Sequence, residues 1–116
     1  MINNNIVADK SEDFALQIIF LYKDLSDNKK EFVLSKQILR SGTSIGANIA
    51  ESKRAQSRAD FYSKLNISLK EAEETVYWLR LLNKSEYIDN AEYESLVKQC
   101  DEIIRILVAT LKHSEQ

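Results

Sequence analysis

Apolar residues recur every three or four positions in four stretches of this chain, which is the spacing of one face of an α-helix. The pattern predicts helices over residues 11–25 and 31–55, a third from Ser57 to about Asn83, and a fourth that follows Asp89 and runs through Leu111. The connections between them are short and polar, which favours antiparallel neighbours. We therefore predict an all-α fold, an up-down-up-down antiparallel four-helix bundle. The residues predicted to face its core are Phe14, Ile18, Leu21, Tyr22, Leu25, Leu34, Ile38, Ile45, Ile49, Phe61, Leu65, Leu69, Ala72, Val76, Leu79, Tyr93, Leu96, Cys100, Ile103, Ile104, Leu107 and Leu111.

Polar residues with the spacing of helix caps precede three of these stretches. In such a cap the first side chain accepts a hydrogen bond from a backbone N–H three residues later, which has no partner inside the helix. The predicted cap pairs are Asn28 with Glu31, Ser57 with Asp60, and Asp89 with Glu92.

The composition favours helices over strands. The chain has 116 residues, no proline and only two glycines, whereas a β-rich fold of this size needs many turns built from both. Its length suits one hydrophobic core, so we expect a single domain over residues 1–116 with a flexible N-terminus at residues 1–10. The opening residues lack the pattern of a signal peptide, and no apolar stretch is long enough to span a membrane. The single cysteine, Cys100, cannot form an internal disulfide, and the expected location is the cytoplasm.

Two of the predicted helices carry more apolar residues than one face can hold. On the first helix Ile19 and Phe20 fall outside the core stripe, and on the third Ile67, Trp78 and Leu81 form a second stripe. A helix that is apolar on two sides is usually buried on two sides. We interpret these five residues as an interface between copies of the chain; burial of Trp78 within one subunit is the alternative.

The segment RSGTSIGANIAES, in the second predicted helix, contains both glycines of the chain. Gly42, Gly46 and Ala50 are four residues apart and form a smooth strip, along which another helix can approach closely. Each glycine costs a helix about 1 kcal/mol relative to alanine. We favour a packing role over a ligand site, because a pocket needs more than a smooth strip.

A polar strip formed by Ser41, Ser44, Asn48 and Glu51 runs beside the smooth one. One interpretation is a hydrogen-bonded seam between helices, which fixes their register because a slipped register leaves buried polar groups unpaired. The alternative is a patch that contacts an oligomeric partner or a ligand. We favour the seam, since nothing adjacent supplies a reactive group.

This segment, together with DFYSKLNISLKEAEETVYWLRLL, resembles the bacterial four helix bundle proteins related to the 23S rRNA intervening-sequence proteins. The similarity covers nearly the whole chain and is most specific in the run Ser-Ile-Gly-Ala-Asn-Ile-Ala-Glu from Ser44 to Glu51. Ser52 follows that run, where many members carry Gly or Ala. A similar bundle serves as the accessory protein of diversity-generating retroelements. The resemblance implies a homopentamer, a barrel of five bundles, with nucleic-acid binding proposed and no catalytic activity established.

Positive charge is concentrated in the middle of the chain. Residues 29–70 hold nine basic and three acidic side chains, net +6, whereas residues 1–28 have net −3 and residues 71–116 net −5. Lys36 and Arg54 are eighteen residues apart, which is five helical turns, so we expect them to point the same way with Arg40 near the same line. Phosphate binding depends on summed charge, which several copies around a ring would multiply. The residues predicted to contact RNA or DNA are Lys36, Arg40, Lys53, Arg54, Arg58 and Lys64.

Two other interpretations stand beside nucleic-acid binding. In one, these basic residues form an ordinary solvated face or pair with acids of a neighbouring subunit, and the oligomer is a scaffold for a protein partner. In the other the chain is an enzyme, which its residues argue against. The single histidine, His113, cannot supply the two Glu-x-x-His motifs of a di-iron bundle, and no phosphate-binding loop, cysteine pair or Ser/His/Asp set occurs. We expect no catalytic residue, no cofactor and no metal.

Overall fold

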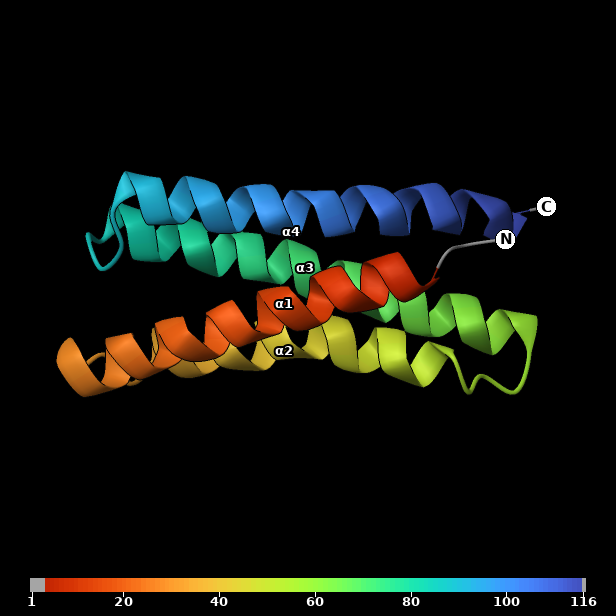
Figure 1. Cartoon of the computed structure of the whole chain (residues 1–116), viewed down its shortest axis with the longest axis horizontal. Helices are drawn as coiled ribbons and strands as arrows, with labels where there is room; N and C mark the ends of the chain where they lie inside the picture. The colour runs from red at the N-terminus through yellow and green to blue at the C-terminus, as the bar shows by residue number, and fades with distance from the viewer. Residues whose placement is uncertain (1–3, 116) are drawn as a thin grey trace.

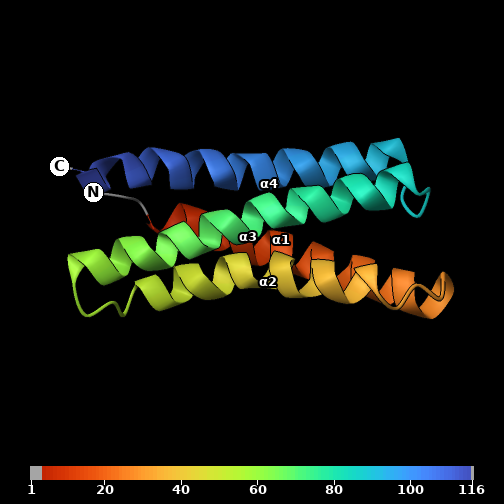
Figure 2. The same cartoon turned by 180° about the vertical axis from the view of Figure 1, so that it is seen from behind.

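The computed structural model describes residues 4–115 and contains four long helices (Figures 1 and 2). They are α1 (Asn4–Lys23), α2 (Leu34–Ser52), α3 (Arg58–Lys84) and α4 (Asn90–Leu111). A π-helical turn, Asp24–Asn28, follows α1, and a 3-10 turn, Lys112–Glu115, follows α4. Successive helices are antiparallel, and the bundle measures 46 × 22 × 19 Å. The predicted all-α up-down-up-down bundle is confirmed.

Each helix packs against two neighbouring helices, and the four interfaces differ in extent. Packing is most extensive between α2 and α3, then between α1 and α2 and between α3 and α4, and it is sparsest between α1 and α4. α1 and α3 therefore lie diagonally across the bundle from each other. The α2–α3 turn and both termini lie at one end of the molecule, and the other two connections lie at the opposite end (Figure 1).

The core is a column of aliphatic side chains together with Phe14 and Cys100. Of the residues predicted to face it, most are buried, while Tyr22, Leu34, Phe61, Leu69, Val76, Tyr93, Ile104 and Leu111 are half-buried at its margin. The largest side chains that are fully buried include Phe14, Ile18, Leu25, Ile38, Ile45, Ile49, Leu65, Leu79, Leu82, Ile103 and Leu107.

Two of the three predicted caps form. Ser57 accepts a hydrogen bond from the backbone N–H of Asp60 at the start of α3, and Asp89 accepts one from Glu92 at the start of α4. The predicted pair of Asn28 and Glu31 is wrong. Asn28 instead donates to Asp24, and the Glu31 carboxylate accepts from the backbone N–H groups of Val33 and Ser35. Glu31 thus caps α2 from a position just before the helix.

The main differences from the predicted helix boundaries lie at the start of α1 and at both ends of α2. α1 begins at Asn4, so residues 4–10, which we predicted to be a flexible N-terminus, belong to the helix, and Val7 is buried in the core. Residues 1–3 lie outside the described part of the chain. α2 begins at Leu34 rather than near Glu31, and it ends at Ser52 rather than about Ala55. That earlier end changes how the basic residues are arranged.

Candidate nucleic-acid interface

The predicted basic residues are divided between the two ends of α2. Lys36 lies in the first turn of α2, at the end of the molecule opposite the α2–α3 turn. Lys53 and Arg54 follow the last residue of α2, and Arg58 is the first residue of α3. The predicted alignment of Lys36 with Arg54 along one helix is therefore wrong, because Arg54 lies outside the helix. About 25 Å of helix separates the two groups at 1.5 Å per residue.

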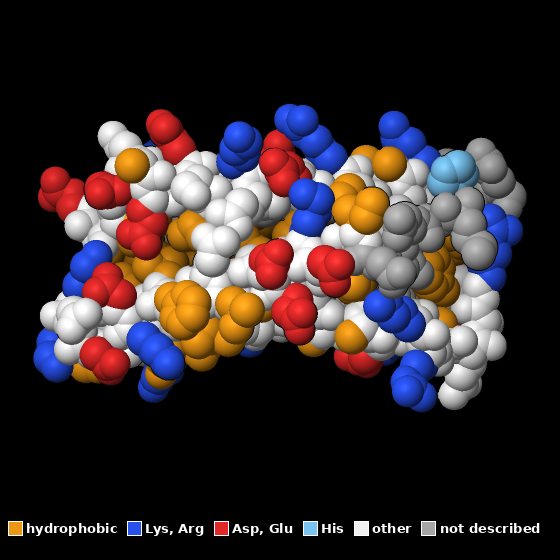
Figure 3. Space-filling model, in the orientation of Figure 1, with side chains coloured by type: hydrophobic (Ala, Val, Ile, Leu, Met, Phe, Trp, Pro, Cys, Tyr) orange, Lys and Arg blue, Asp and Glu red, His pale blue; other side chains and the backbone are white. Residues whose placement is uncertain are grey.

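Lys53, Arg54 and Arg58 form the densest group of cations, and we call them the basic turn. The segment from 53 to 58 contains these three charges and no acidic residue. Backbone hydrogen bonds from Lys53, Arg54 and Ala55 to the last carbonyls of α2 give the chain its tight path here. All three cations are exposed, and none forms an ion pair with another residue in the described part of the chain. Figure 3 shows lysine and arginine side chains at this end of the molecule.

Arg58 is held in place by two contacts. Its guanidinium lies 5.4 Å from the centre of the Tyr62 ring, and one of its N–H groups donates to the backbone carbonyl of His113 at 2.7 Å. This second contact brings the start of α3 beside the end of α4. Lys112 therefore joins the same end of the molecule, although it belongs to the acidic last third of the sequence. The antiparallel order of helices was a signal that could have predicted this neighbourhood.

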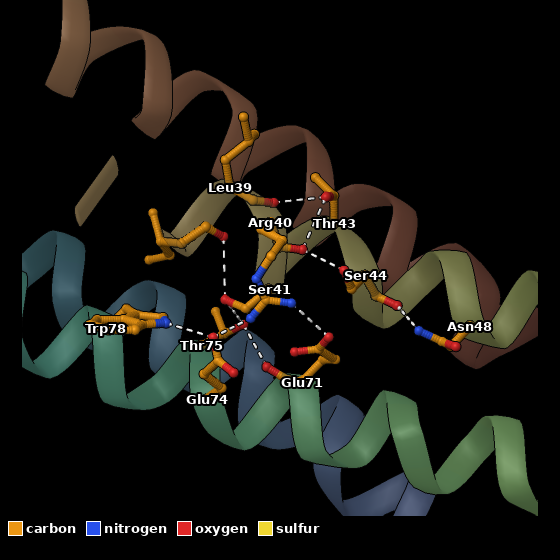
Figure 4. A network of polar contacts seen from close by, with 11 residues as sticks. Leu39, Arg40, Ser41, Thr43, Ser44, Asn48, Glu71, Glu74, Thr75 and Trp78 are labelled. Carbon is orange, nitrogen blue, oxygen red and sulfur yellow. Dashed lines mark hydrogen bonds and ion pairs between the residues drawn. The ribbon is translucent and has the colours of Figure 1, made fainter. Parts of the chain in front are cut away.

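Arg40 does not belong to a free cationic surface. Its guanidinium donates to Glu71 at 2.9 Å and also to Glu74, both on α3 (Figure 4). The indole N–H of Trp78 donates to the same Glu74 carboxylate at 2.9 Å. The hydrogen bonds from Trp78 and Arg40 hold the pKa of Glu74 below its ordinary value, although burial opposes them. Two carboxylates thus neutralise Arg40 within one chain, and it is removed from the predicted contact residues.

Lys64 is also paired within the chain. Its ammonium lies 3.4 Å from Glu51, across the interface between α3 and α2. Lys64 is half-buried and Glu51 is exposed, so the pair is accessible to solvent and contributes little to stability. Of the six residues predicted to contact nucleic acid, the structure leaves the basic turn and Lys36 without an ion pair among the described residues.

The polar strip of α2 is only partly a seam between helices. Ser41 is buried and accepts a hydrogen bond from Thr75 of α3 at 2.9 Å. Ser44 and Asn48 instead donate to backbone carbonyls of α2 itself, at Arg40 and Ser44 respectively (Figure 4). The expectation that these two side chains bridge helices is wrong, since the i−4 carbonyl is the nearer partner.

Two residues of α3 that the sequence analysis missed complete the seam. Ser68 is buried and donates to the backbone carbonyl of Ile45 at 2.8 Å, one helix across. Thr75, the partner of Ser41, lies two turns further along. Both fall on the core stripe of α3 between Leu65 and Leu79, so their polarity on an apolar face was the signal that could have identified them.

The smooth strip of α2 packs against α1. A Cβ added at Gly42 would lie 2.8 Å from Ile18 Cγ2, and one added at Gly46 would lie 3.1 Å from the Ser11 hydroxyl. Ala50 is exposed and lies on the wall of an open hollow of about 380 Å³ between α1 and α2. At both glycines, the atoms of α1 that come closest to the α2 backbone therefore belong to side chains, those of Ile18 and Ser11.

The residues predicted to form an oligomer interface lie on opposite sides of the bundle. Phe20 on α1 is 63% exposed and Ile67 on α3 is 40% exposed, whereas Ile19, Trp78 and Leu81 are half-buried. Figure 3 shows hydrophobic side chains gathered on α1, in the half nearer the α1–α2 connection. Leu16, 48% exposed, adds to the apolar surface of α1.

Within residues 4–115 the structure offers no group of three or more His, Cys, Asp or Glu side chains placed to hold a metal ion. In the same part of the chain, none of the helices has the length and apolar character needed to cross a membrane.

The fold and the basic turn together define an all-helical bundle protein with a cationic end. The chain belongs to the family of 23S rRNA-intervening sequence proteins, whose family model matches residues 3–109. The resemblance stated from the sequence is thus confirmed.

A solved structure shows the same architecture. It is the 1.70 Å crystal structure of a protein with unknown function from the S23 ribosomal protein family of Bacteroides thetaiotaomicron. That protein is 59% identical to this chain and superposes with a TM-score of 0.93, over 94% of this chain and 97% of its own. The chain has no significant match among curated proteins.

Proposed function

We propose that this chain is a non-enzymatic, homo-oligomeric bundle protein that binds RNA or DNA electrostatically through its basic turn. This proposal rests on one observation: Lys53, Arg54 and Arg58 are exposed, lie within six residues of one another, and form no ion pair with the described residues. Clustered cations attract phosphates because binding releases the counterions that surround nucleic acid. The family description, which names an intervening sequence of 23S rRNA, is compatible with such a ligand.

The negative net charge of the chain does not oppose this proposal. At about 0.1 M salt, charges interact over roughly 10 Å, so acids at the far end of a 46 Å molecule are screened from the basic turn. Several copies in one oligomer would present several basic turns, which multiplies the attraction to one strand. The expected number of five copies rests on the family resemblance.

The direct test is a binding titration of the unmodified protein with RNA and with DNA at two salt concentrations, combined with light scattering to determine the oligomer mass. Binding should weaken steeply as salt rises, since counterion release drives it. Base sequence should matter little, because phosphate contacts carry no sequence information. Absence of binding to either nucleic acid at low salt would refute the proposal.

A scaffold that binds a protein partner is the second candidate. It is favoured by the exposed apolar surface of α1 at Leu16 and Phe20, since large exposed apolar patches commonly mark protein interfaces. The neutralisation of Arg40 by Glu71 and Glu74 also reduces the cationic surface available to phosphates. A cytoplasmic location is part of either proposal.

A further inference from the structure

A hollow of about 600 Å³ lies next to the basic turn, between the first turns of α3 and the end of α4. Tyr62 and Asn66 line it from α3, and Val108 and Lys112 line it from α4 and the 3-10 turn. It is a shallow, open hollow whose walls carry an aromatic ring, an amide, an aliphatic side chain and an ammonium group. None of the residues that the sequence predicted as site residues lines it.

Of the five polar side chains that line this hollow, only Ser114, whose hydroxyl donates to the Leu111 carbonyl, has a hydrogen-bond partner among the described residues. The Tyr62 hydroxyl and the side chains of Ser63, Asn66 and Lys112 make no hydrogen bond or ion pair with the described residues. An asparagine amide offers two donors and an acceptor, which matches the hydrogen-bonding edge of a nucleobase. These groups are therefore available to a ligand.

The cations beside the hollow are placed to hold phosphates. Arg58 lies over the Tyr62 ring and uses one N–H on the His113 carbonyl, which leaves most of the five donors of its guanidinium for other partners. Lys112 lines the hollow itself. A strand that follows the basic turn would meet positive charge on both sides of the hollow.

We propose that this hollow receives an unpaired base of a single-stranded nucleic acid while the basic turn and Lys112 hold the flanking phosphates. The inference rests on the proposed function and specifies the class of ligand, which is single-stranded rather than double-stranded nucleic acid. A base inside a duplex is stacked and paired, so its ring and its edge cannot reach Tyr62 and Asn66. An unpaired base presents both, and base stacking on aromatic side chains is the usual means by which proteins hold single strands.

The test compares single strands with duplexes. Labelled RNA and DNA oligonucleotides of about 12 nucleotides, within the range of known single-strand sites, are titrated as single strands and as duplexes. Tyr62→Leu should weaken binding of the single strands at least about five-fold, since stacking of one base is worth that much, and should leave duplex binding unchanged. Asn66→Ala should also weaken single-strand binding selectively. Asn66 is exposed and alanine is the better helix former, so this variant will fold.

Tyr77→Leu is the matched control. Tyr77 is an exposed tyrosine on the same helix with an arginine, Arg80, 6.0 Å from its ring centre, but it does not line the hollow. The Tyr77→Leu variant should bind single strands and duplexes with the affinity of the parent. If the parent binds single strands and Tyr62→Leu and Asn66→Ala bind as well as Tyr77→Leu, the hollow is not the site and the basic turn alone remains. If Tyr62→Leu weakens duplex binding equally, its effect passes through Arg58 and the inference is overturned. If the parent binds neither form at low salt, the proposed function fails as well, and a protein is the ligand to seek.

Discussion

Gly42 of α2 lies against Ile18 of α1 so closely that no side chain fits between them. A Cβ at position 42 would lie 2.8 Å from Cγ2, 2.9 Å from Cγ1 and 3.2 Å from Cβ of the isoleucine. Both residues are buried. Because the crowded atoms include the root of a β-branched side chain, which has few rotamers, the contact cannot be relieved by a flexible tip. The helices themselves would have to separate.

Gly42→Ala should therefore destabilise the protein. We expect the free energy of unfolding to fall by about 1–2 kcal/mol: overpacking at so short a contact should cost about 2–3 kcal/mol, and the gain in helix propensity returns about 1 kcal/mol. Gly46→Ala is the matched control and should be nearly neutral. Its new Cβ is crowded by one atom only, the Ser11 hydroxyl at 3.1 Å, and the gain in helix propensity offsets the small shift that this contact requires. Gly46→Leu, which is larger, should cost roughly 1–3 kcal/mol. Urea denaturation of the three variants measures this. A Gly42→Ala protein as stable as the parent would contradict the close packing.

The hydrogen bonds to Glu74 should make stability depend on pH. The folded-state pKa of Glu74 is lowered by Trp78 and Arg40. A lowered pKa means that the carboxylate stabilises the folded state above the ordinary pKa of 4.5, and that this contribution is lost as pH falls through the folded-state value. Glu74→Gln should thus lower the urea midpoint at pH 7 and have less effect at about pH 3. An equal effect at both pH values would show that the carboxylate charge is not involved.

Cys100 should be inert in the folded protein. It is buried, and burial, with a smaller effect of Asp101, raises the pKa of its thiol to about 12. Since the thiolate is the reactive form, alkylation should be far slower than for a free cysteine, whose pKa is about 8.5. Iodoacetamide labelling at pH 8, followed by mass spectrometry, should modify the protein only in denaturant. Rapid labelling of the native protein would show that α4 opens locally at this position.

The sequence predicted the fold because helix periodicity, caps and connection lengths are local properties. Ser57 and Asp89 were identifiable as caps from spacing alone. The neutralisation of Arg40 was not predictable, because its partners lie 31 and 34 residues away and meet it only through the register of α2 against α3. Arg54 was misplaced for a related reason, since nothing in the local pattern marks the end of α2 at Ser52. The candidate site therefore depended on contacts between helices, which periodicity does not specify.

The predicted interface residues on α1 and α3, of which Phe20 and Ile67 are exposed, should join neighbouring copies head to tail. They lie on opposite sides of the bundle, so one surface of a copy meets the other surface of the next, which is a heterologous contact. Phe20→Glu and Ile67→Glu should each reduce the mass measured by light scattering at micromolar concentration. Ala91→Glu, an exposed change in the first turn of α4, is the control.

Mixing the two variants tests the head-to-tail arrangement itself. The Phe20→Glu copy keeps an intact α3 surface and the Ile67→Glu copy keeps an intact α1 surface, so together they retain one contact and should form a heterodimer. A parent that is monomeric would refute oligomerisation. Variants that still self-associate would place the interface elsewhere.

The basic turn should account for most of the affinity for nucleic acid. Replacing Lys53, Arg54 and Arg58 together with glutamine removes three exposed cations without removing a core contact. Affinity should fall, and the slope of log affinity against log salt should decrease by about 0.9 for each lost contact with duplex DNA or about 0.7 with a single strand. Titrations at several salt concentrations measure both quantities, and the oligomer mass should not change.

Lys36→Gln and Lys98→Gln provide the controls for charge alone. Both lysines are exposed, but Lys36 lies at the opposite end of α2 and Lys98 lies on α4, away from the turn. Arg40→Gln should be equally silent toward nucleic acid, because two carboxylates already neutralise that residue. If these variants weaken binding as much as changes in the basic turn, attraction is spread over the whole surface and the turn is not a site. If the triple variant binds RNA and DNA as well as the parent does, phosphate contacts lie elsewhere, and the exposed surface of α1 becomes the better candidate for a partner.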